Sequence, residues 1–246
     1  MTASIAFLFL GFYPIFFGLE EWAVSNGIGL RRTIPGGVKV ELVGNTQNDA
    51  MRTYWLLAFM NIASITGRLS SGFLSDHFGA LNVHCVVTFI SGVLVIAFWP
   101  FVTTVEGAIG FVITFGAFSG AVIGLPPASM AYILGPKPTA QAKLGQWTGM
   151  MYTFAAIPAL IGPIIVGAGL AATGRNFWML QGFSGACLII SSFCMLMAIY
   201  VKRREKYNEM FRRRLSSVNS TGGLLSRFMS RDTAGTRDPE MGEVSR

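Results

Sequence analysis

The stretch YWLLAFMNIASITGRLSSGFLSDHFGALN, from Tyr54 to Asn82, decides the fold of this chain. It starts as an apolar run, and about 18 or more such residues suffice to cross a bilayer. Arg68 lies near the far end of that run. A charge inside a membrane helix is costly, so it must be paired, face a watery cavity or reach the interface. Arg68 is therefore either a binding residue or an interfacial anchor.

A short glycine-containing turn follows the apolar run. Gly72 and Gly79 bracket the segment GFLSDHFG, and glycine permits tight turning and close approach of helices. We place Asp76 at the start of the next helix, where the positive end of the helix dipole favours a carboxylate. The stretch thus predicts two helices joined by almost no loop.

The remainder of the chain repeats the apolar pattern. Of its 246 residues, 52% are hydrophobic and 13% are charged, whereas soluble domains contain about 25% charged residues. Five further apolar runs are Ala3–Leu19, Val83–Trp99, Glu106–Ser129, Leu144–Leu170 and Asn176–Val201. The fold class predicted is an all-α membrane protein with six transmembrane helices. We assign residues 1–201 to the bundle, with an outer loop at 27–52, and residues 202–246 to a basic, disordered tail.

Glycine and proline mark particular positions in these runs. Gly116, Gly120 and Gly124 recur every four residues and form a smooth face for helix packing. Pro126 and Pro127 then break or kink their helix. We also assign Gly162 and Pro163 to helix packing, at a point where the fifth helix is interrupted. Broken helices are typical of transporters that expose backbone to a cavity.

The apolar runs contain few side chains of the kinds that act in catalysis or bind metals. The sequence has no H-E-x-x-H, C-x-x-C, G-x-S-x-G or phosphate-binding glycine loop, so we expect no enzyme, no cofactor and no metal. Three cysteines, all in apolar runs, are expected to be free thiols. Glu20 and Glu21 are either close to a substrate or solvated at a helix end. His84 is either a proton carrier or an interfacial histidine.

Charge distribution indicates the orientation of the chain. From Lys202 onward there are 11 Lys/Arg and 6 Asp/Glu, so most of the net charge of +7 lies in the tail and no nucleic-acid partner is expected. Seven basic residues at 202–214 would be attracted to anionic lipid. The positive-inside rule then places both termini in the cytoplasm. We expect the membrane to be the plasma membrane.

Two motifs in the opening stretch carry a family resemblance. Asn61, Ser64, Gly67 and Arg68 form N-x-x-S-x-x-G-R, and Gly72, Leu74, Asp76 and Gly79 follow G-x-L-x-D-R-x-G, with His77 in place of the arginine. FGAFSGAVIGLPP, LIGPIIVG and FWMLQGFSG are similar to later helices of the same family. From Phe12 to Val201 the chain resembles the C-terminal six-helix half of a fungal monocarboxylate-transporter-like permease of the major facilitator superfamily.

The resemblance implies secondary transport of small monocarboxylates or similar organic anions, often with a proton. It implies that Arg68 meets the substrate carboxylate, with Asn61 and Ser64 beside it. It also implies that Gly72, Asp76 and Gly79 form a gating motif between helices. Guanidinium suits the first role because it stays charged and can donate two parallel hydrogen bonds to a carboxylate.

Such a transporter places its site between two six-helix halves, and one half is present here. We therefore expect a fragment or truncated half that pairs with an N-terminal half or with a second copy. A non-transporting membrane adaptor that acts through the basic tail is the alternative.

Overall fold

The computed structural model describes residues 1–28, 53–135, 138–174 and 176–234. Its helices are α1 (Thr2–Ser25), α2 (Tyr54–Phe78), α3 (Ala80–Val93), η1 (Leu94–Phe98), η2 (Trp99–Phe101), α4 (Val105–Gly124), α5 (Pro126–Leu134), α6 (Pro138–Gln141), α7 (Leu144–Ala172) and α8 (Trp178–Ala234). Most of the predicted outer loop lies outside the described residues. The chain divides into two compact units, Met1–Ile199 and Tyr200–Arg246, and each is treated by itself.

The first unit has the all-α membrane fold that the sequence predicts. Among the described residues of both units, five helical segments are long and apolar enough to cross a membrane: Thr2–Ser25, Ala80–Phe101, Val105–Leu134, Leu144–Ala172 and Trp178–Arg212. The sixth predicted span, α2, has 25 residues, and about 20 suffice to cross. Its asparagine, serines and Arg68 keep it below the hydropathy that the apolar parts of the five segments reach.

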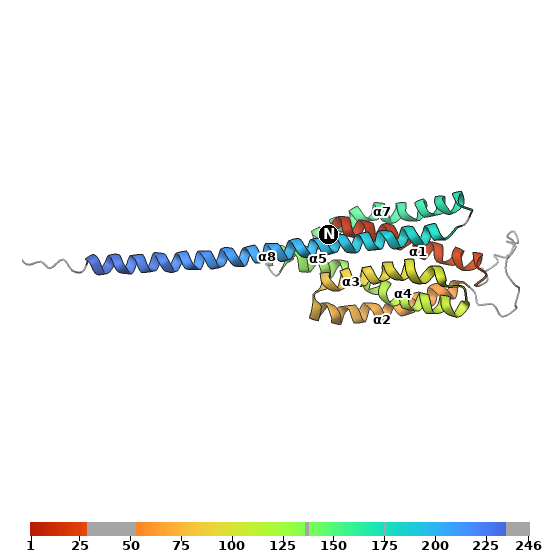
Figure 1. Ribbon diagram of the computed structural model, residues 1–246, viewed down its shortest axis with the longest axis horizontal. Coiled ribbons are helices and arrows are strands. Elements are labelled where there is room, and N and C mark those ends of the chain that lie inside the picture. The colour runs from red at the N-terminus through yellow and green to blue at the C-terminus, as the bar shows by residue number, and fades with distance from the viewer. Residues whose placement is uncertain (29–52, 136–137, 175, 235–246) are drawn as a thin grey trace, which may run out of the picture. The chain divides into compact units, whose positions relative to one another are not determined.

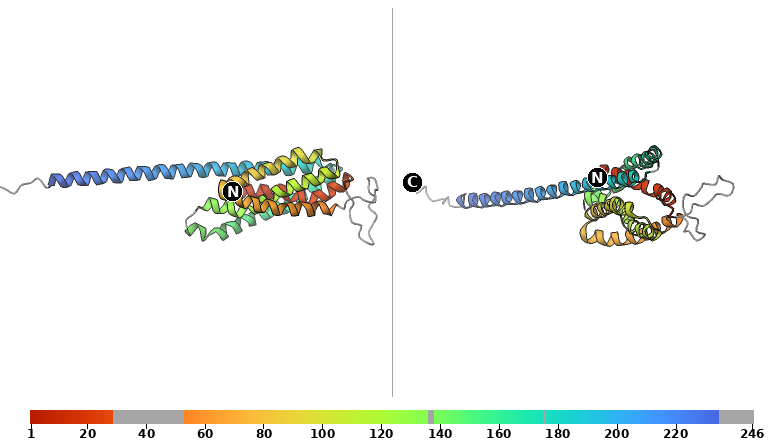
Figure 2. Two further views of the ribbon diagram at one scale, coloured as in Figure 1. Left: turned by 90° about the horizontal axis from the view of Figure 1, so that it is seen from below. Right: turned by 45° about the vertical axis from the view of Figure 1, so that its right-hand side comes forward.

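Two pairs of parallel helices make up much of this unit (Figures 1 and 2). One pair is α1 with α7, and the other is α2 with α4. The first part of α8 runs antiparallel to α1, and Ser4 and Ser191 join these two helices by reciprocal hydrogen bonds. The α8 segment also lies against α3, where the Ser192 hydroxyl donates to the backbone oxygen of Cys85 at 3.0 Å.

An aromatic cluster connects the two pairs at the centre of the core. Trp99 is fully buried, with its ring centroid 5.6 Å from that of Trp22 and 5.2 Å from that of Phe111. Phe115 continues the cluster, 5.6 Å from Phe111 and 6.3 Å from Phe12. Edge and offset contacts of this kind stabilise a core beyond the area they bury.

The α2–α3 hairpin has almost no loop, as predicted. Gly79 separates the two helices with a φ of +85°, a conformation that glycine adopts without steric cost. The placement of Asp76 at the start of the next helix is wrong. Because α2 continues to Phe78, Asp76 lies in its last turn, at the end where the helix dipole disfavours a carboxylate.

Proline affects α4 and α7 differently. The predicted break at Pro126 and Pro127 is confirmed, since α4 ends at Gly124 and α5 begins at Pro126. The predicted interruption at Gly162 and Pro163 is wrong, because α7 continues through both Pro158 and Pro163. Membrane helices tolerate proline where neighbouring groups satisfy the freed backbone atoms.

The second unit differs from the predicted disordered tail. The α8 helix continues through residue 202 to Ala234, and the Arg204 guanidinium lies 5.2 Å from the Tyr200 ring centroid. Lys, Arg, Glu and Met are good helix formers, and their frequency from residue 202 to 214 favours a helix there. Residues 235–246 lie outside the described residues.

Candidate substrate-binding sites

The α2 helix has one face buried against α4 and one exposed face. Met60, Ser64 and Gly67 are among the buried residues, whereas Asn61 and Arg68 are exposed. Asn61 and Arg68 are seven residues apart, which is close to two helical turns, so they share one stripe of the exposed face. The structure therefore places Asn61 and Arg68 on one stripe, about 10 Å apart along the helix axis. Ser64 lies between them, on the adjoining side that is buried against α4.

Hydrogen bonds within α2 explain how its polar side chains are accommodated. The Asn61 amide donates to the Leu57 carbonyl at 2.9 Å, and the Ser64 hydroxyl donates to the Asn61 carbonyl at 2.7 Å. Arg68 has no carboxylate partner within the described part of the chain. Its guanidinium is thus available for an external anion.

The glycines of α4 set the distance between α2 and α4. A Cβ atom on Gly116 would lie 2.5 Å from the Met60 backbone oxygen, and one on Gly120 would overlap the Ser64 carbonyl. From the other helix, a Cβ atom on Gly67 would overlap the Ala117 carbonyl. Real Cβ atoms do not approach other atoms this closely, so side chains at these positions would force the two helices apart.

Gly124 and the hairpin glycines lie in looser surroundings. A Cβ atom on Gly124 would be 3.7 Å from Arg68 Cγ, which is ordinary contact, and one on Gly72 would meet nothing within 4 Å. The aliphatic part of Arg68 therefore passes beside a position with no side chain. The gating role of Gly72, Asp76 and Gly79 stays a prediction.

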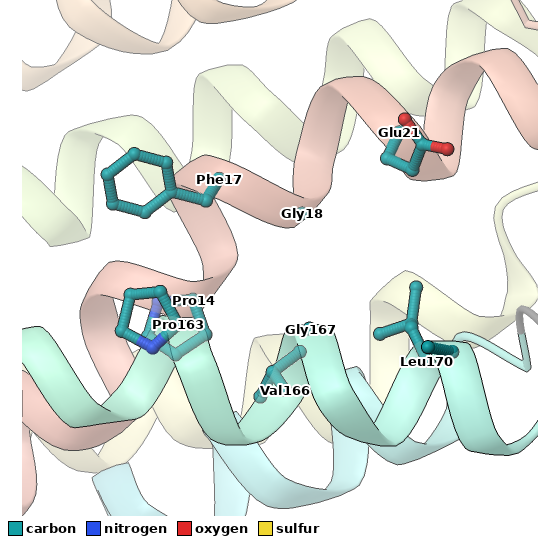
Figure 3. Close-up of a pocket in the computed structure, with 9 residues that line it drawn as sticks. Pro14, Phe17, Gly18, Glu21, Pro163, Val166, Gly167 and Leu170 are labelled. Carbon is teal, nitrogen blue, oxygen red and sulfur yellow. The ribbon is translucent and has the colours of Figure 1, made fainter.

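A cavity of about 380 Å³ lies between α1 and α7 (Figure 3). It is lined by Pro14, Phe17, Gly18, Glu21, Pro163, Val166, Gly167, Leu170 and Ala171. The two helices are in close contact at one level, because a Cβ atom on Gly162 would overlap the Leu10 carbonyl. Beyond that contact they separate, so the cavity widens toward the level of Glu21 and Leu170.

The sequence only partly indicated this cavity. The sequence leaves Glu21 with two possible roles, and the structure places it in the cavity wall. The other lining residues, such as Phe17, Val166 and Leu170, are ordinary apolar residues of a membrane helix in the sequence. One sequence pattern could have indicated the cavity. Each of the two helices has a proline followed by a glycine four residues later, Pro14 with Gly18 and Pro163 with Gly167.

The two alternatives for His84, a proton carrier or an interfacial histidine, stay predictions. Its side chain is fully buried, and its Nδ1 atom lies 3.1 Å from the Ser129 hydroxyl of α5. The predicted free thiols are confirmed for Cys85, Cys187 and Cys194.

These features define a multi-pass helical membrane protein with an exposed arginine and an apolar cavity. Comparison with curated proteins gives similarity to transporters of the MFS type. The chain is 36% identical over 152 residues to the MFS transporter asaE of Aspergillus flavus, which covers 62% of this chain and 33% of that protein. It is 33% identical over 186 residues to the aspyridones efflux protein apdF of Emericella nidulans, covering 76% of this chain and 33% of that protein.

A further relative is the agnestins efflux protein AgnL12 of Paecilomyces divaricatus. It is 27% identical over 198 residues, covering 80% of this chain and 39% of that protein. No protein-family model matches the chain. The chain thus spans about a third of the length of the curated relatives it matches.

Proposed function

We propose that this chain forms part of a secondary transporter that carries small organic molecules across a membrane. Its similarity to MFS-type transporters supports the class of protein. Two relatives are named as efflux proteins, which favours the export direction. We further propose that the chain acts together with an N-terminal half or with a second copy of itself. Both termini are proposed to lie in the cytoplasm, with the protein in the plasma membrane.

The observation that carries the proposal is the exposed Arg68 on a membrane helix. An unpaired charge on a membrane helix is expensive, and a substrate anion would offset the cost. We therefore propose that Arg68, with Asn61 on the same face, binds an acidic group such as the carboxylate of a monocarboxylate or similar organic anion. Coupling to a proton belongs to the same proposal.

The test compares Arg68→Lys with Arg68→Ala in an assembly that contains an N-terminal half. Lysine keeps the charge but lacks the planar two-point grip on a carboxylate. Loss of a charge-assisted hydrogen bond costs about 1.5–3 kcal/mol, so both variants should reduce transport of a labelled monocarboxylate at least about tenfold.

Expression at the cell surface is matched between variants, and Arg203→Lys in the second unit serves as the control. Both Lys and Arg side chains can extend toward the interface. Normal transport by Arg68→Lys would therefore mean that Arg68 is an anchor and would overturn its substrate role.

A further inference from the structure

We infer that the cavity between α1 and α7 binds an apolar small molecule through a hydrogen-bond donor, such as an amine or a hydroxyl group, that faces Glu21. This inference concerns a second site, which Arg68 does not line, and its biological role rests on the proposed transport function. The cavity has a volume of about 380 Å³, which falls within the range of about 300–1,000 Å³ that is typical of small-molecule sites.

The shape of the cavity follows from the packing of the two helices. Gly162 brings α7 against the backbone of α1 at Leu10, and Pro14 lies beside the same contact. Toward the C-terminal ends of both helices the backbones separate, and Gly167 leaves the wall open because a Cβ atom there would meet nothing within 4 Å. The result is a wedge with a closed end at the prolines and a wide end at Glu21.

The residues that line the cavity determine which kind of ligand it would bind. Phe17, Val166 and Leu170 offer aromatic and aliphatic surface, and Glu21 supplies the carboxylate among the lining residues (Figure 3). Apolar walls with a small number of placed polar groups are the usual form of a small-molecule site. An apolar body would be drawn from water into this wedge by the hydrophobic effect.

Glu21 fixes the polarity of the bound molecule. An ionised carboxylate accepts hydrogen bonds and donates none. Its two oxygens offer about four acceptor positions, so Glu21 can accept a bond from a ligand in addition to the interaction it has within the protein. A ligand with its own carboxylate at this end would be repelled. The cavity is therefore matched to donors and is mismatched to small carboxylates.

Binding can be measured without transport, using the full chain in nanodiscs of neutral phosphatidylcholine. The probe is 9-aminoacridine, a fluorescent tricyclic cation with N–H donors, and acridine-9-carboxylate is the matched acidic probe. Fluorescence titration should show saturable binding of the amine and at least about tenfold weaker binding of the acid. Glu21→Gln should reduce the difference in affinity between the two probes, because the amide has no charge but nearly the same shape as the carboxylate.

Two variants with their controls locate the binding. Gly167→Leu fills the wedge and should abolish saturable binding of 9-aminoacridine, whereas Gly149→Leu on the same helix also meets open space and should leave binding unchanged. Glu20→Gln is the control for Glu21→Gln, since Glu20 does not line the cavity. Thermal unfolding of each variant shows that it is folded.

Three results would overturn the inference: equal binding of both probes, unchanged binding by folded Gly167→Leu, or equal effects of the two glutamate variants. Different results would contradict the proposed function. A chain that binds the amine at this cavity but supports no transport in the complete assembly contradicts the proposed function alone. A chain that transports but shows none of these binding differences contradicts the inference alone.

Discussion

The α2–α4 and α1–α7 pairs are both parallel and both use glycine, yet one is closed and the other opens into a cavity. In the closed pair, Gly67, Gly116 and Gly120 allow backbone contact on successive turns. In the open pair, Gly162 allows such contact at one level. Lipid supplies little hydrophobic drive for helix association, so close packing of small residues decides how near two membrane helices come.

A few glycines determine which helix surfaces pack against each other and which remain open to a ligand. A repeat of small residues at four-residue spacing keeps α2 and α4 together, and leaves the exposed face of α2 to carry Arg68. A single close contact at Gly162 acts as the narrow end of a wedge. Gly167, one turn beyond Pro163, then contributes empty space to the cavity wall instead of a helix contact.

The largest effect is expected from a side chain in the closed pair. Gly120→Ala places a Cβ atom against the Ser64 carbonyl, and overpacking of this kind costs about 1–3 kcal/mol. The matched control is Gly110→Ala, in the same helix but with nothing within 4 Å; there alanine should stabilise by up to about 1 kcal/mol. Thermal unfolding of the purified variants measures both, and equal stability would contradict the closed packing of α2 on α4.

A smaller effect is expected at the single contact of the open pair. Gly162→Ala meets the Leu10 carbonyl, but α7 can move outward because much of its surface is exposed. We expect a destabilisation of about 1 kcal/mol, at the lower end of overpacking costs, with Gly149→Ala as the control. A loss of stability larger than that of Gly120→Ala would show that α7 is held as firmly as α4.

The smallest effect is expected where α1 is joined to α8. The Ser4 hydroxyl donates to the Ser191 carbonyl at 2.9 Å, and the Ser191 hydroxyl donates to the Ser4 carbonyl at 2.7 Å. Hydrogen bonds between membrane helices contribute about 0.6 kcal/mol on average. A double-mutant cycle of Ser4→Ala and Ser191→Ala, followed by thermal unfolding, should give a coupling of that order. Strictly additive single effects would mean that these hydroxyl groups do not hold α1 in place.

Several features of the bundle could be read directly from the sequence. Apolar run length fixed the approximate position of each span, and the four-residue glycine spacing indicated a packing face. Pro126 and Pro127 marked the end of α4 because two prolines together remove backbone donors and clash with the preceding turn.

Other features depended on tertiary contacts that the sequence does not encode locally. Asp76 lies four residues before α3, which begins at Ala80, because the segment after Gly72 continues as helix to Phe78. Asn61 and Ser64 belong to one motif and are neighbours on α2, but Ser64 is buried because it lies on the side that meets α4. The cavity was missed because it depends on how far α7 diverges from α1, and that distance follows from packing at Gly162.

The most direct test measures whether a ligand occupies the cavity between α1 and α7. Gly167→Cys and Gly149→Cys are prepared in a background in which Cys194, the cysteine that is not fully buried, is replaced by serine. The rate of labelling by a fluorescent maleimide is then measured with and without 9-aminoacridine. We predict that the probe slows labelling of Gly167→Cys and leaves that of Gly149→Cys unchanged. Equal labelling rates of Gly167→Cys with and without the probe would contradict a binding cavity between α1 and α7.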